Sequence, residues 1–179
     1  MGLEMVDQNY IAIAAQYDDE DTAAADFEAV GAHFAKTPKR EVFDAALINR
    51  GLDGEVAIVK RDESGKHRGT RKGLGVGLAT GLAVALFPAV ALGGALVVAG
   101  GSGAGIGAIA GHIGRKTPSK NLEAISETLD AGSGGIVLVL EPDDVAEVEK
   151  LLTGAAKVTK KDLSVDDKEL DDEVDEAYE

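Results

Sequence analysis

Residue types that could do chemistry are few in this chain, and they lack the spacing of a catalytic or metal site. The three histidines, His33, His67 and His112, lie far apart in the sequence. The absence of cysteine excludes disulfides, thiolate metal sites and cysteine nucleophiles. No HExxH zinc motif and no Walker phosphate loop is present. We therefore expect a protein that is not an enzyme, with no catalytic residue, metal or cofactor.

Four consecutive acidic residues at 18–21 raise the question of a cation site. They lack the alternating ligand spacing and the central glycine of an EF-hand loop. A helical pattern follows them over residues 22–36, where Ala23, Phe27, Val30 and Phe34 fall near one face. Acidic residues at that position cap a helix and complement its positive end. We expect capping rather than metal binding.

The most unusual stretch is residues 73–114, which contain no charged side chain and in which 23 of 42 residues are Gly or Ala. It divides into two arms of 20 residues, 73–92 and 95–114, with Gly93-Gly94 as the turn and Pro88 as another possible turn. About 20 residues are enough to span a bilayer as a helix. The pattern predicts a helical hairpin that enters or lies in a membrane.

Two other interpretations of this stretch are weaker. Residues 95–110 loosely match a nucleotide-binding fingerprint, but the parallel βαβ context that such a loop requires is missing. A helix pair that is apolar all round must be covered on every side, and we expect the rest of a single chain to supply too little apolar material for that. We therefore exclude burial within one soluble monomer.

Glycines recur at four-residue spacing in both arms. This spacing stacks small residues on one helix face, so that another helix can approach closely. We expect helix packing and self-association through these residues: Gly73, Gly77, Gly81, Gly101, Gly103, Gly105, Gly107 and Gly111.

Charge is distributed unevenly around the apolar stretch. The net charge of the chain is −14, yet residues 60–120 hold nine basic and two acidic residues. Juxtamembrane Lys and Arg favour an anionic membrane surface, whereas the acidity of the whole chain and its 4% aromatic content argue against nucleic acid. The expected headgroup contacts are Arg68, Arg71, Lys72, Arg115, Lys116 and Lys120.

The remaining pattern predicts an α+β fold. Expected strands lie at 10–17, 42–49, 55–61, 135–140 and 157–164, and expected helices at 22–36, 121–129 and 142–152. Without the hairpin, the order is that of a ferredoxin-like βαββαβ core with an appended αβ pair. Residues 8–164 form this domain, interrupted by 73–114. We expect residues 165–179 to be an acidic disordered tail.

Several segments together resemble a bacterial family, domain of unknown function 1269. They are YDDEDTAAADFEAV, EVAIVKRDESGKHR, the glycine-rich stretch and GGIVLVLEP, and the resemblance covers roughly residues 8–162. Members are often labelled predicted membrane proteins, and the resemblance implies a loose association with stress responses. It implies no catalytic residue.

The sequence thus predicts a non-enzymatic, membrane-associated, self-assembling homo-oligomer, to which the family resemblance adds a stress-related role. An alternative is a soluble homo-oligomeric shell or filament whose glycine-rich hairpins pack in a shared core. The first ten residues have neither the basic nor the apolar run of a signal peptide. We expect the protein on the cytoplasmic face of the membrane or in a cytoplasmic assembly.

Overall fold

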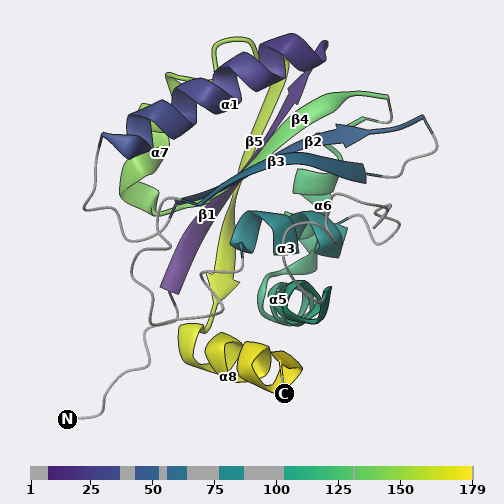
Figure 1. Ribbon diagram of the computed structural model, residues 1–179, viewed down its shortest axis with the longest axis vertical. Helices are drawn as coiled ribbons and strands as arrows, with labels where there is room; N and C mark the ends of the chain where they lie inside the picture. Colours follow the sequence, from purple (N-terminus) through teal and green to yellow (C-terminus); the bar gives the residue numbers. More distant parts are fainter. Residues whose placement is uncertain are drawn as a thin grey trace.

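The protein contains one antiparallel sheet with helices on both faces (Figure 1). The computed structural model describes residues 8–36, 43–52, 56–63, 77–86, 103–130 and 132–178. Within them the strand order is β3-β2-β4-β1-β5. The predicted α+β class is confirmed. The strands are β1 (Gln8–Tyr17), β2 (Phe43–Arg50), β3 (Val56–Glu63), β4 (Gly134–Leu140) and β5 (Lys157–Val165).

Twice in the sheet, two strands with the same direction are separated by one strand that is antiparallel to both. β1 and β2 are both antiparallel to β4, which lies between them. In the same way, β4 and β5 are both antiparallel to β1. The strand β4 is central and buried at every residue, as its continuous apolar sequence predicts. β5 is an edge strand, as predicted, and pairs with β1 over Gln8↔Val165 to Gln16↔Lys157.

One face of the sheet is covered by α1 (Glu20–Ala35), the 3-10 turn η2 (Pro142–Asp144) and α7 (Val145–Glu149). Phe27, Phe34 and Phe43 are buried here with the strand residues that point to this side. The rings of Phe34 and Phe43 stack with their centroids 4.0 Å apart. This layer follows the predicted pattern closely, although α7 ends three residues before the expected end of its helix.

The other face is covered by α3 (Leu78–Leu86), α5 (Gly103–Lys116) and α6 (Ser119–Ser126), and α8 (Asp167–Tyr178) packs against α5. Figure 1 shows these helices on the side of the sheet opposite α1 and α7. Leu78, Leu82, Ile109 and Ile113 are fully buried in one cluster with side chains of the sheet.

The exclusion of burial for the glycine-rich stretch is therefore wrong for its described residues. The whole second face of the sheet, together with α6 and α8, covers α3 and the inner side of α5. Alanine and glycine also need less apolar cover than larger residues. Among the described residues, no helix has both the length and the apolar character needed to cross a membrane. Residues 87–102, which include both predicted turns, lie outside the described part.

The C-terminal residues do not form the expected disordered tail. Val165 ends β5, and all but the last residue of 167–179 belong to α8. Leu170 and Val174 are spaced by four residues, lie on one face of this helix and are fully buried. The high charge density of this segment hides the apolar pair in the sequence.

Candidate functional site: the face formed by α5 and α8

A buried carboxylate fixes α3 to the sheet. Asp44 of β2 is 3% exposed, and its Oδ2 accepts a hydrogen bond of 3.2 Å from the backbone nitrogen of Ala79. Ala79 lies in the first turn of α3, where free N–H groups and the helix dipole favour a negative charge. The preceding Gly77 has φ of +106°, a conformation that favours glycine. The start of the glycine-rich stretch is thus adapted to this position on the sheet.

Gly81 brings α3 and α5 together. A Cβ atom at Gly81 would lie 2.9 Å from Cβ of Ile109 and still closer to its Cγ2, which is tighter than real side chains allow. From the sequence, the glycines of this repeat are predicted to permit close helix packing. The structure places Gly81 at such a contact, between two helices of the same chain.

The glycine repeat of α5 points the other way. Gly107, Gly111 and Gly114 are exposed, and they form what we name the outer glycine face. Among described atoms, none lies within 4 Å of a Cβ built at Gly107 or Gly114, and one built at Gly111 meets only Nη1 of Arg115, at 3.7 Å. The contacts described within this chain therefore do not account for these glycines.

The other predicted packing glycines are less informative. Gly103 and Gly105 lie in the first turn of α5. Gly73 and Gly101 are outside the described residues, as are Arg68, Arg71 and Lys72.

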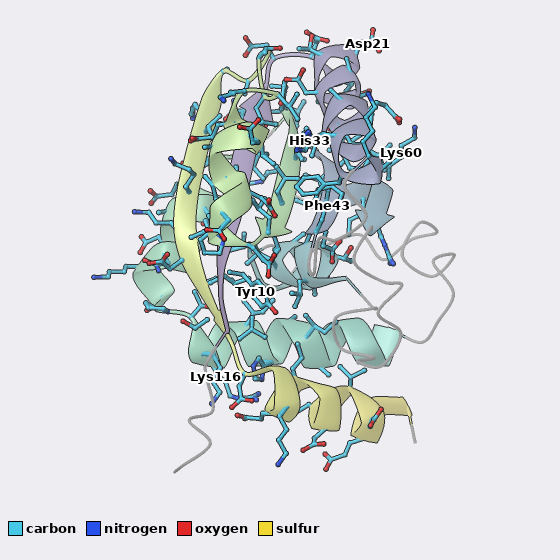
Figure 2. All side chains as sticks on the ribbon, turned by 90° about the vertical axis from the view of Figure 1, so that its left-hand side faces the viewer. Tyr10, Asp21, His33, Phe43, Lys60 and Lys116 are labelled. Carbon is cyan, nitrogen blue, oxygen red and sulfur yellow. The ribbon has the colours of Figure 1, made fainter. Side chains whose placement is uncertain are left out.

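The basic end of α5 is paired with acids of α8. Lys116 Nζ lies 2.9 Å from Glu169 Oε2, and Arg115 lies 3.6 Å from Glu169 Oε1 and also forms an ion pair with Glu173. Figure 2 shows Lys116 at the end of α5, beside the start of α8. The hydrogen bond from Lys116 holds the pKa of Glu169 below its usual range. Two of the expected headgroup contacts are thus occupied within the chain, whereas Lys120 is exposed on α6.

His112 lies beneath this pairing and is fully buried. Its Nε2 accepts a hydrogen bond of 3.1 Å from the backbone nitrogen of Asp166, so the ring hydrogen must be on Nδ1. Nδ1 faces Glu173 Oε2 at 3.5 Å. Asp166 in turn caps α8, since its Oδ1 accepts from the nitrogen of Glu169 at 3.0 Å. His112 therefore positions the start of α8.

The same residues have the composition of a metal site but not its chemistry. Ligand atoms of His112, Glu169 and Glu173 lie within 4.8 Å of one another. A metal ion on Nδ1 would move the ring hydrogen to Nε2, where it would face the N–H of Asp166, which is also a donor. Arg115 and Lys116 already neutralise the two carboxylates. The cluster is better described as an ion-pair network that holds α8 on α5.

The acidic run at 18–21 caps α1 as predicted. Asp19 Oδ1 accepts from the nitrogen of Thr22 at 2.7 Å, and Oδ2 accepts from its hydroxyl at 2.7 Å. Both hydrogen bonds lower the pKa of Asp19, and the bond from the Thr22 hydroxyl has the larger effect. Glu20 instead accepts a hydrogen bond from the Asn49 side chain. Asp19 and Glu20 of the run thus have separate partners.

An open groove of about 490 Å³ lies beside β5, between α6 and the start of α7. Lys160 and Lys161 line it, but Lys160 is paired with Glu149 Oε1 at 2.7 Å. The groove does not gather a convergent set of polar groups, and we place no site in it.

Sequence reasoning missed Asp44 and α8. An acid inside the apolar strand VFDAALIN is a signal, but its partner Ala79 is 35 residues away and could not be identified. For α8 the signal was local, because Asp166 followed three residues later by Glu169 is typical of a helix start. No protein-family model, curated protein or solved structure matches the chain. The resemblance to domain of unknown function 1269 stays a prediction.

Proposed function

We propose that this protein is a non-enzymatic, cytoplasmic, self-assembling protein whose copies meet through the outer glycine face of α5. The observation that supports this most directly is that no described atom lies within 4 Å of a Cβ built at Gly107 or Gly114. In an exposed helix, each glycine costs about 1 kcal/mol relative to alanine. Three such positions on one face weaken α5 without any described benefit to the monomer, and close approach of a second helix would supply that benefit.

This proposal corresponds to the soluble alternative from the sequence, with one change. In this proposal the described glycine-rich helices stay in their domain, which the contacts of Asp44 with α3 and of Gly81 with α5 support. Among the described residues, we assign the contact with a partner to the outer side of α5. Assembly would then join complete domains through a narrow helical contact.

We further propose that β1-α1-β2 and β4-α7-β5 form a ferredoxin-like core into which β3 and the α3–α6 segment are inserted. In each unit a helix connects two strands that run in the same direction, and a strand of the other unit lies between them. The pairing of β1, β2, β4 and β5 supports this arrangement. A stress-related role rests on the family resemblance alone.

The test uses the double variant Gly107→Gln/Gly111→Gln in the full chain. Glutamine adds bulk to the outer glycine face without creating an apolar patch. Gly77 is left unchanged, because any side chain at its positive φ would strain the fold itself. A matched control is Ala25→Gln/Ala29→Gln, which has the same spacing on the exposed side of α1.

Mass photometry and sedimentation velocity give the outcome. We expect oligomers for the wild type and the control, and monomers for the glycine variant with an unchanged circular dichroism spectrum. A wild type that stays monomeric at every concentration contradicts the proposal, and so does a glycine variant of unchanged size.

A further inference from the structure

The α8 helix covers a surface that combines positive charge with apolar side chains. Glu169 and Glu173 pair with Arg115 and Lys116, at the end of α5. Beside them, Leu170 and Val174 are buried in the cluster that also contains Ile109 and Ile113 of α5. Removing α8 would therefore expose a basic helix end next to an apolar strip. Lys120 lies only four residues beyond Lys116 and is already exposed.

The contacts that hold α8 on α5 are weak enough for a competing anionic surface to displace the helix. Among the α8 side chains that the structure describes, the buried apolar ones are Leu170 and Val174, both of medium size. The paired side chains of Arg115, Glu169 and Glu173 are 55%, 41% and 26% exposed, so that solvent and salt screen their attraction. Helices held by few buried apolar contacts are the elements that open first.

We propose that α8 is an internal acidic strap over the basic end of α5, and that an anionic lipid surface displaces it. The strap carries seven acidic residues and one lysine, and so imitates the charge of such a surface. Once α8 is released, Arg115, Lys116 and Lys120 can contact lipid phosphates, while the acids of α8 are repelled from them. The proposal is independent of self-association, which uses the outer glycine face.

A lipid surface fits better than a soluble polyanion or a nucleic acid. Displacement of α8 uncovers apolar side chains of the cluster in which Leu170 and Val174 are buried, together with the charges, and a bilayer interface accepts both. A polyanion in water would leave that apolar strip exposed. Each Lys or Arg near an anionic membrane surface contributes about fivefold in affinity, so the three basic residues together contribute about a hundredfold.

The first experiment compares two variants of equal charge in the full chain. Glu169→Gln/Glu173→Gln removes the acids that hold Arg115 and Lys116. Asp172→Asn/Glu176→Gln removes two exposed acids of the same helix and is the matched control. Binding is measured by flotation with vesicles of phosphatidylserine in phosphatidylcholine and with vesicles of phosphatidylcholine alone.

We expect Glu169→Gln/Glu173→Gln to bind anionic vesicles about tenfold more tightly than wild type, the effect of weakening two or three exposed ion pairs. The control should stay within about twofold, and neither should bind neutral vesicles. Arg115→Gln/Lys116→Gln should bind more weakly than the strap-released variant. Equal gains in both acid variants would show a general charge effect and overturn the proposal, as would no binding by any variant.

The second experiment observes the strap itself. A zero-length carbodiimide cross-linker joins Lys116 to Glu169 in the resting protein, because their atoms are 2.9 Å apart. We expect anionic vesicles to lower the yield of this cross-link, read by mass spectrometry, and neutral vesicles to leave it unchanged. An unchanged yield while the protein is bound to anionic vesicles overturns displacement. Loss of the cross-link with duplex DNA but not with vesicles assigns the surface to nucleic acid and equally overturns it.

Discussion

Gly81 and Gly107 belong to glycine repeats of the same spacing, yet one added methyl group should change the stability of the protein in opposite directions at these two positions. Alanine at Gly107 meets open space, as far as the described residues show, and gains the helix propensity that glycine lacks. We expect Gly107→Ala to raise the free energy of unfolding of the monomer by about 1 kcal/mol. For a domain of this size that corresponds to about 2–4 °C in Tm.

Alanine at Gly81 gains the same propensity but must push Ile109 away. The added Cβ would lie 2.9 Å from the Cβ of Ile109, so α3 or α5 has to shift. Inserting a methyl group into a packed core costs about 1–3 kcal/mol. After the gain in helix propensity, a net loss of about 1 kcal/mol remains. The two variants should therefore differ by about 2 kcal/mol in stability.

The assay is urea unfolding followed by circular dichroism, at a concentration where sedimentation shows monomers. An unchanged slope m between variants shows that only stability differs. The double variant Gly81→Ala/Ile109→Ala lacks Cγ2 of residue 109, the nearest obstructing atom, and should therefore cost less than the sum of the two single substitutions. Equal stabilisation by Gly81→Ala and Gly107→Ala would refute the close contact between α3 and α5.

Two further outcomes follow from charged groups. Asp44→Ala should lower the free energy of unfolding by about 1–3 kcal/mol, because it removes a buried acceptor of the Ala79 N–H, whereas the exposed cap variant Asp19→Ala should cost about 1 kcal/mol in the same urea assay. The pKa of Glu169 is lowered in the folded protein, so its contribution to α8 docking is complete above the unfolded value of about 4.3 and is lost as pH falls through the folded value. Hydrogen exchange of α8 amides between pH 7 and 3 should show this loss, and Glu169→Gln should remove the dependence; the same pH profile in wild type and variant would contradict it.

The sequence predicted best those elements that have a clear apolar run or a clear cap. The short apolar runs of β1 and β4, and the acidic cap before α1, identified one half of the domain correctly. In these elements the pattern itself carries the information about burial. The five strands were predicted to within about two residues of their observed bounds.

The other half depends on long-range contacts. A helix of glycine and alanine, such as the start of α5, has nearly the same side chain on every face, so hydropathy alone does not distinguish lipid, solvent and protein core as its surroundings. The decisive contacts lie elsewhere in the chain, in Asp44 of β2 and in α8. The helix α8, which was predicted to be a disordered tail, is one of the elements that cover α5.

The few larger residues of α5 nevertheless indicate which face of this helix is turned toward the core. Ile109 and Ile113 are spaced by four positions and mark the buried face. Gly107 and Gly111 each precede one of them by two positions, which places the glycines about 200° around the helix, on the opposite side. The first repeat has no such separation, since Leu78 and Leu82 directly adjoin Gly77 and Gly81, and all four are buried. Two glycine repeats of equal spacing thus serve different purposes. The inner repeat fixes α3 within its own domain, and the outer repeat leaves a face on which only a contact from outside the described chain can use the space.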